Sequence, residues 1–138
     1  MADPLSISAS IIAVLGAGVS VSKALNTVIQ GYREAPAAIT ALSNEVSDLV
    51  LVLQEVRSRV ENLADGLNLT VAIRKADAKL GELRSFVESL GVLMVGTGTK
   101  NRFHKARWVA RKKTARVLKQ DLKDLKSDII LLLGARNL

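Results

Sequence analysis

The chain has 138 residues, of which 49% are hydrophobic and 24% charged, a length and composition that suit one globular domain and exclude an intrinsically disordered chain. The absence of cysteine excludes a disulfide framework and a thiolate metal site, and the single histidine excludes a histidine-rich metal site. Aromatic residues make up 3% of the chain and proline occurs twice, which favours an all-α fold over a β-sandwich or barrel.

The net charge of +7 is concentrated in the second half of the chain. Residues 71–138 contain sixteen Lys or Arg against six Asp or Glu, whereas residues 1–70 contain four against seven. Residues 97–120 contain nine Lys or Arg and no acidic residue, and residues 4–22 contain no charged residue at all. These two segments are the ones that point to a function.

The uncharged N-terminal segment has the pattern of a helix that begins at Asp3-Pro4, since Asp caps free N–H groups and Pro at the first helical position loses no hydrogen bond. Apolar residues recur at spacings of three and four, which predicts one buried helical stripe: Ile7, Ile11, Val14, Gly18, Val21, Leu25, Val28 and Tyr32. Small residues form a second stripe: Ser6, Ser10, Ala13, Ala17, Ser20 and Ala24.

No face of this first helix is strongly polar before Lys23, unlike a surface helix of a soluble domain. Its nineteen uncharged residues approach the roughly 20 residues that span a bilayer. Two interpretations follow, a helix buried by the rest of a bundle and a helix that enters a membrane. The two interpretations hold at different times if the helix is buried in the bundle first and is released on activation.

Three further helices are predicted, from Pro36 to Asp65-Gly66, from about Leu69 to Leu90, and from about Asn101 to Leu133. Their apolar seams are, in order, Ile39, Leu42, Val46, Leu49, Leu53, Val56, Val60 and Leu63; Leu69, Ile73, Ala76, Leu80, Leu83, Val87 and Leu90; and Leu118, Leu122, Leu125, Ile129 and Leu132. Four long helices with short connections predict an up-down four-helix bundle. We expect residues 1–138 to be a single domain excised from a longer protein.

The basic segment of the last helix has two interpretations, a solvated helix face or a surface for an anionic partner. Anionic lipid attracts a basic segment by about 1 kcal/mol per cation, and nucleic acid attracts cations as well. The core side of this segment is predicted to consist of Phe103, Ala106, Ala110, Val117 and Leu118. Trp108 suits either a membrane interface or the core.

Catalysis has no candidate residues in this sequence. His104 is the only ordinary base near neutrality and stands among cations that oppose its protonation, so we expect a surface or packing histidine. We therefore expect no enzyme activity, small-molecule substrate, metal or cofactor. Asp3 and the lack of a cation before the apolar segment argue against a signal peptide, which suits a cytoplasmic domain.

The opening segment Ala2-Asp3-Pro4-Leu5-Ser6-Ile7-Ser8-Ala9-Ser10-Ile11-Ile12-Ala13-Val14-Leu15 closely resembles the start of fungal HeLo-like N-terminal domains. Trp108 with its flanking cations, followed by Leu118, Leu122, Leu125, Lys126, Ser127 and Ile129, resembles the last helix of that family. The resemblance covers the whole chain, and the opening segment is its specific part, because the middle helices match only as heptads.

The resemblance implies a helical bundle akin to the HeLo domain, the four-helix domain of the mixed-lineage kinase-like pseudokinase and the coiled-coil or RPW8-type domains of plant immune receptors. Such domains precede the nucleotide-binding and repeat modules of NOD-like receptor and STAND proteins. The implied activity is cell-death execution, in which self-association exposes the N-terminal helix and the helix permeabilises the plasma membrane. The inserting residues implied for this chain are Leu5, Ile7, Ile11, Ile12, Ala13, Val14, Leu15, Gly16, Gly18, Val19 and Val21.

Anionic membrane lipid is the partner expected for the basic residues of the last helix. The lipid-binding candidates are Lys105, Arg107, Trp108, Arg111, Lys112, Lys113 and Arg116. A non-lytic signalling or adaptor module that packs against a partner domain, or against copies of itself, is the alternative. Nucleic-acid binding rests on net charge only, because the segment has no recognisable binding motif.

Overall fold

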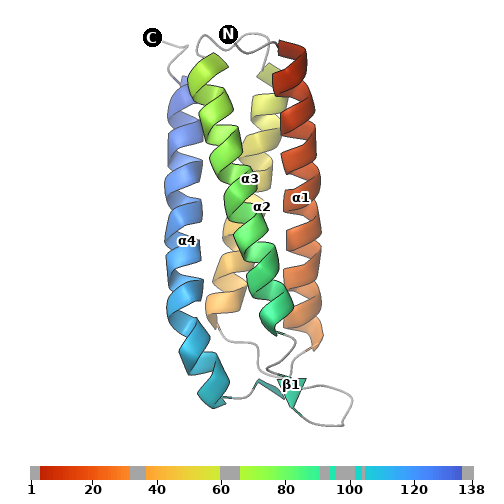
Figure 1. The fold of residues 1–138 in the computed structure, drawn as a ribbon, viewed down its shortest axis with the longest axis vertical. Coiled ribbons are helices and arrows are strands. Elements are labelled where there is room, and N and C mark those ends of the chain that lie inside the picture. Colours follow the sequence, from red (N-terminus) through yellow and green to blue (C-terminus); the bar gives the residue numbers. More distant parts are fainter. Residues whose placement is uncertain are drawn as a thin grey trace.

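The computed structural model describes residues 4–31, 37–59, 66–90, 94–95, 102–103 and 105–134. Four helices account for nearly all of them: α1 (Pro4–Gly31), α2 (Ala37–Arg59), α3 (Gly66–Ser89) and α4 (Lys105–Gly134). Successive helices run in opposite directions, and the start of α1 and the end of α4 lie at the same end of the bundle (Figure 1). The predicted all-α, up-down four-helix bundle is confirmed.

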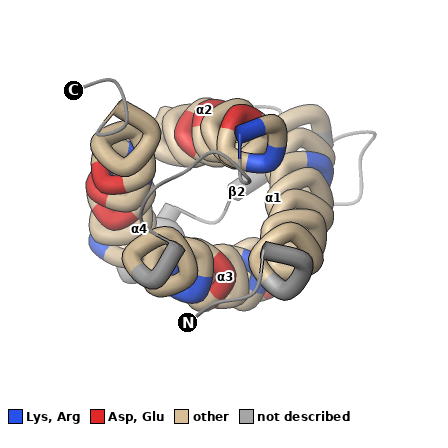
Figure 2. The backbone as a smooth tube through the Cα atoms, turned by 90° about the horizontal axis from the view of Figure 1, so that it is seen from above, with Lys and Arg blue, Asp and Glu red and all other residues tan. Residues whose placement is uncertain are grey.

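The four helices occupy the corners of a square, in which α1 packs against α2 and α3, and α4 packs against the same two helices. Viewed along the bundle, α1 lies diagonally opposite α4, and α2 lies opposite α3 (Figure 2). Helices α2 and α3 are therefore consecutive in sequence without being packing partners.

The predicted seams make up most of the core, which also includes Leu15, Ala72, Phe86, Ala115 and Leu133. Leu132, predicted in the seam of the last helix, is half-buried, and its neighbour Leu133 is buried instead. Helix α1 contributes Ile11 and Leu25, both fully buried, and the other described members of its stripe are buried or half-buried. The largest fully buried side chains of the other helices are Ile39, Leu42, Leu49, Leu53, Leu69, Leu80, Leu83, Leu90 and Leu122. Of the predicted seam residues, Tyr32, Val60 and Leu63 lie outside the described residues.

Two predictions for the start of the last helix are wrong. Helix α4 begins at Lys105, not near Asn101, because strand β2 (Arg102–Phe103) pairs with strand β1 (Met94–Val95) in an antiparallel ribbon with Met94 opposite Phe103. Val117, predicted in the core, is 50% exposed. It precedes the buried Leu118 by one residue and so lies about 100° around the helix from it.

Candidate membrane-interacting site

Helix α1 contains a segment, Ile7–Gln30, that is long and apolar enough to cross a membrane, with a mean hydropathy of 1.6. Core helices of soluble proteins meet the same criteria. The exposed fraction of the segment and its contacts with the other helices therefore decide whether it can enter a membrane. In this bundle 33% of the apolar stretch within this segment is buried. The remainder is half-buried or exposed, although it carries almost no charge.

The predicted inserting residues fall on two sides of α1. Ile7, Ile11, Val14, Leu15, Gly18 and Val21 are buried in the bundle. Ile12, Ala13, Gly16 and Val19 are exposed, with Ile12 at 49% and Val19 at 40%. Leu5 belongs to α1, but its side chain lies outside the described part. Between residues 7 and 22, helix α1 thus presents an uncharged outer surface while its apolar stripe fills the core.

The two glycines of α1 have different surroundings. A Cβ atom at Gly18 would lie 2.8 Å from Val50 Cγ2 of α2, closer than side chains approach each other, whereas a Cβ at Gly16 would meet nothing within 4 Å. Gly18 therefore allows α1 and α2 to come close together. Gly16 faces open space and plays no part in that packing.

Few polar contacts join α1 to its neighbours. Among the described side chains, Ser43 Oγ of α2 donates a hydrogen bond to Asn26 Oδ1 at 3.4 Å, and Arg84 Nη1 of α3 donates one to Ser20 Oγ at 3.4 Å. Both distances are long for hydrogen bonds. The one charged side chain described on α1, Lys23, is exposed and has no ion pair in the described part of the chain.

Helix α4, in contrast, is joined to both neighbours by ion pairs. Lys126 Nζ of α4 lies 3.2 Å from Glu45 Oε2 and 3.5 Å from Asp48 Oδ2 of α2. Asp121 Oδ2 of α4 lies 2.8 Å from Lys79 Nζ of α3, which also contacts Glu82 Oε2 at 2.7 Å. The hydrogen bonds to Asp121 and Glu82 raise the pKa of Lys79.

The predicted lipid-binding cations do not share one face. Lys112, Lys113 and Arg116 are exposed, but Arg111 is half-buried and its Nη1 donates a 2.8 Å hydrogen bond to Ser89 Oγ of α3. Lys105, Arg107 and Trp108 belong to α4, while their side chains lie outside the described part, and His104 lies outside the described residues. The three exposed cations are therefore the supported part of the candidate surface.

The prediction omitted two lysines that continue this surface. Lys112, Arg116, Lys119 and Lys123 follow one another at spacings of four, three and four, which places them on one side of α4. We refer to these four residues as the cationic row. No described carboxylate pairs with any of them. The spacing of these four residues is visible in the sequence.

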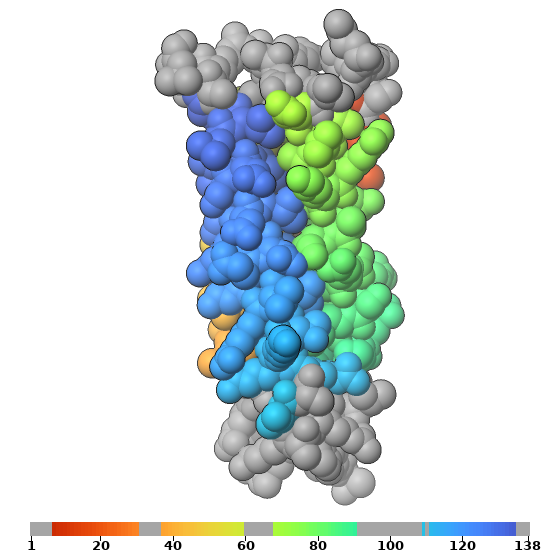
Figure 3. All heavy atoms as spheres, turned by 60° about the vertical axis from the view of Figure 1, so that its left-hand side comes forward, coloured from red at the N-terminus to blue at the C-terminus, as the bar shows by residue number. Residues whose placement is uncertain are grey.

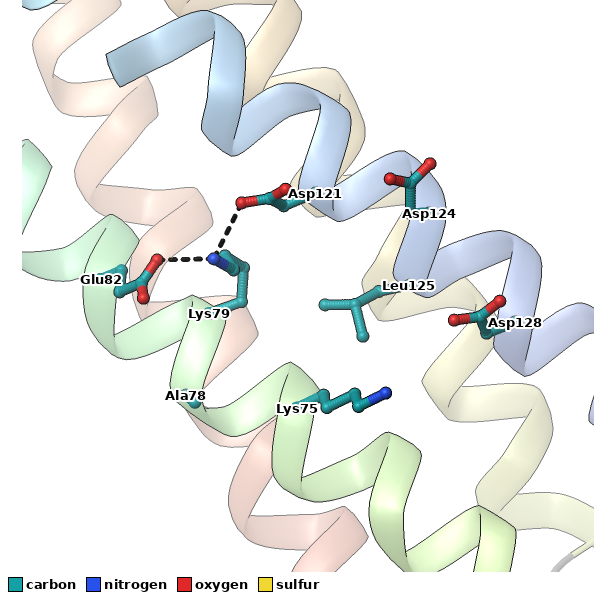
Figure 4. A pocket seen from close by; sticks show the side chains of 8 residues that line it. All are labelled: Lys75, Ala78, Lys79, Glu82, Asp121, Asp124, Leu125 and Asp128. Atoms are coloured by element: carbon teal, nitrogen blue, oxygen red, sulfur yellow. Dashed lines mark hydrogen bonds and ion pairs between the residues drawn. The ribbon is translucent and has the colours of Figure 1, made fainter.

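Acidic side chains occupy the other flank of α4. Asp121, Asp124 and Asp128, here called the acidic row, face a groove between α3 and α4 that Lys75, Lys79 and Glu82 also line (Figure 4). Asp124 accepts a 2.9 Å hydrogen bond from Gln120 Nε2. Among the described residues, no group of three or more His, Cys, Asp or Glu side chains lies close enough together to hold a metal ion. Helices α3 and α4 lie side by side along this face (Figure 3).

A second groove, of about 400 Å³, lies between α1 and α2. It is mainly apolar and is lined by Val19, Ser22, Lys23, Ser47, Val50 and Leu51. Leu51 is 63% exposed and Val19 40%, so two large apolar side chains at this groove face solvent. The sequence pattern did not indicate Leu51, because it lies off the α2 seam.

Residues 2–88 match the family model described as Pigment biosynthesis cluster protein PigL N-terminal. The match spans α1, α2 and almost all of α3, which is more than half of the chain, and it does not extend to α4. No curated protein and no solved structure matched the chain. The specific resemblance of the opening segment is thus confirmed, and that of the last helix stays a prediction. The chain belongs to the PigL N-terminal family, a family of HeLo-like fungal N-terminal helical domains.

Proposed function

We propose that this domain is a non-enzymatic, membrane-targeting cell-death execution domain of a fungal immune-type protein. On self-association α1 leaves the bundle, inserts in anionic membranes and permeabilises them. The domain acts from the cytoplasm and relocates to the plasma membrane when activated. It needs no cofactor or small-molecule substrate, and its partners are anionic lipid, further copies of the chain and an attached signalling domain.

The observation that carries this proposal is the contrast between what α1 contains and how α1 is held. The helix has membrane length, and Lys23 is the one described charge on its outer surface. Its described contacts with α2 and α3 are apolar packing and two long hydrogen bonds. Ion pairs hold α4 to both neighbours instead. Apolar packing lost from the bundle is replaced when the same side chains enter hydrocarbon, whereas broken ion pairs have no such replacement there.

The direction of α1 supports the same proposal. Its C-terminal end lies at the end of the bundle where α4 begins, although the two helices occupy opposite corners (Figure 1). The exposed Lys112 and Lys113 belong to this first part of α4. If these cations dock the bundle on anionic lipid, the C-terminal end of α1 lies beside the membrane, and the N-terminal part of α1 leaves its neighbours before it inserts.

Dye release from anionic and neutral vesicles tests the proposal. Ile11 is fully buried, so its replacement by Asp would unfold the bundle, and the exposed Ala13 is the better position. We expect Ala13→Glu to fold normally and to lose leakage, because a carboxylate within the inserted helix costs about 2.5–3.5 kcal/mol. Val71→Glu, at a position 41% exposed on α3, is the matched control and should leave leakage unchanged.

Leakage that Ala13→Glu leaves intact would contradict insertion of α1. Loss of leakage in both variants would show a general effect of added negative charge, and it would also count against insertion of α1. Helicity by circular dichroism and an unchanged unfolding midpoint establish that each variant is folded.

A non-lytic adaptor is the second candidate, and the groove between α1 and α2 favours it. Leu51 and Val19 expose apolar surface there that a partner helix would cover. If the domain is an adaptor, it should cause no leakage from any vesicle, and Leu51→Glu should weaken its association with the partner.

A further inference from the structure

We propose that the outer surface of α4 is a self-association surface, in which the cationic row of one copy binds the acidic row of the next copy with the two α4 helices parallel. The proposal extends the proposed function, since it names the surface by which the copies assemble. It is measured without any membrane, so its outcome is independent of whether α1 inserts.

The first step is that opposite charges occupy opposite flanks of one helix. Lys126 continues the cationic row by three residues and contacts Glu45 and Asp48, so this row runs along the side of α4 next to α2. Asp121 contacts Lys79, so the acidic row runs along the side next to α3. One copy therefore offers a basic edge and an acidic groove in different directions.

The second step is that the bundle leaves much of this charge unsatisfied. Residues 37–44, at the start of α2, contain no charged side chain, and α2 runs parallel to α4 beside the cationic row. Asp124 and Asp128 are exposed, and in the described part neither forms an ion pair. Four carboxylates and two ammonium groups line the groove, which leaves it acidic.

The third step is the register of the two rows. Arg116, Lys119 and Lys123 are spaced by three and four residues, and Asp121, Asp124 and Asp128 are spaced by three and four residues in the same order. A parallel neighbour displaced by five residues, about 7.5 Å along the helix, therefore places each cation opposite one carboxylate. An antiparallel neighbour reverses the order of the spacings and loses this match.

The arrangement explains why the partner is a second copy and what the contact achieves. Both halves of the contact lie on the same chain in matching spacing, and a contact between two different patches repeats from copy to copy. Parallel α4 helices also give the α1 helices of all copies the same direction. Assembly along α4 leaves the diagonally opposite α1 free of the contact (Figure 2).

Sedimentation velocity of the full chain between 10 and 500 µM, in about 20 mM and about 500 mM salt, tests the proposal. We expect association at low salt that weakens at least about tenfold at high salt, because the contact is ionic. Lys119→Glu with Lys123→Glu should be monomeric, as should Asp124→Lys with Asp128→Lys. An equimolar mixture of the two variants should associate again, since each then supplies the charge that the other lost.

Lys23→Glu with Arg74→Glu is the matched control for the cationic-row variant, because it lowers the net charge by the same amount at exposed positions outside both rows. This control should associate like the unmodified chain. A chain that stays monomeric at 500 µM in low salt would overturn the proposal, as would row variants that still associate or a mixture that stays monomeric. Circular dichroism and thermal unfolding show that each variant is folded.

Discussion

At the scale of single residues, Gly18 is the position where α1 and α2 approach most closely among the described glycines. We expect Gly18→Ala to lower the free energy of unfolding by about 1–3 kcal/mol, because the new methyl group meets a stiff valine and the helices must separate. Urea unfolding measures the change. If α1 is the helix that leaves the bundle, the same variant should release dye from anionic vesicles at lower protein concentration.

Gly16→Ala is the control for this substitution on the same helix. Nothing lies within 4 Å of a Cβ there, so alanine should stabilise the helix by about 0.5–1 kcal/mol. Equal effects at Gly16 and Gly18 would show that helix propensity, and not the contact with Val50, sets the response.

The two interhelical lysines make the stability of the bundle depend on alkaline pH. Hydrogen bonds to Asp121 and Glu82 raise the pKa of Lys79 above 10.5. Burial lowers the pKa of Lys126, but its hydrogen bonds and attraction to Glu45 and Asp48 outweigh burial and leave that pKa raised above 10.5 as well. The folded state holds these protons more tightly than the unfolded state, so their stabilisation is complete below 10.5 and disappears as the pH rises through the folded-state values.

We therefore expect the free energy of unfolding to fall above about pH 10.5. Lys126→Met should weaken this alkaline decline and should cost about 1–3 kcal/mol at pH 7, because Glu45, with a side chain 11% exposed, loses its ion pair. Lys75→Met removes a lysine that forms no ion pair with the described residues and should leave the decline unchanged. Denaturant unfolding at pH 7, 9 and 11.5 compares the three proteins.

At the scale of helices, the seams were predictable because each helix has one apolar stripe, and a bundle buries one stripe per helix. The packing partners of each helix were not predictable, because periodicity does not show which apolar stripe packs against which. The arrangement of packing partners determines that α1 and α4 lie diagonally opposite each other. It also determines the ion pairs of Lys79 and Lys126. The ribbon of β1 and β2 was missed because two residues per strand show no periodicity.

The candidate site was predictable to the same extent. The uncharged surface of α1 over residues 4–22 follows directly from the sequence. The sequence does not distinguish Arg111 from its neighbouring cations, and only the structure shows its hydrogen bond to Ser89 of α3. The division of α4 into basic and acidic flanks required knowing which neighbour each flank faces. Neither row was predicted: the spacing of these charges is visible in the sequence, but the packing of α4 shows which side each row occupies.

The start of α4 should bind anionic membranes through cations that are free of other contacts. We expect Lys112→Glu with Lys113→Glu to weaken binding to anionic vesicles by at least about tenfold, since each cation contributes about 1 kcal/mol near such a surface and each reversal adds repulsion. Vesicle co-sedimentation measures binding. Arg74→Glu with Lys75→Glu makes the same change of charge on α3 and should bind normally, and equal losses would assign binding to net charge instead.

At the scale of the whole molecule, the proposed activity requires α1 to separate from the rest of the bundle. The absence of cysteine allows one engineered disulfide to test this directly. A Cβ at position 18 lies 2.8 Å from Val50 Cγ2, so the sulfur atoms of Gly18→Cys and Val50→Cys come within bonding reach. The bond would fasten the middle of α1 to α2 and stabilise the bundle by about 3 kcal/mol.

The oxidised double variant should release no dye from anionic vesicles, and reduction with dithiothreitol should restore release within the same sample. Binding to the vesicles should persist in both states, because α4 and its exposed cations are untouched by the bond. Leakage by the oxidised protein would mean that the bundle permeabilises membranes with α1 in place. The single Gly18→Cys variant, which cannot form the bond within one chain, separates the effect of the tether from that of the larger side chain.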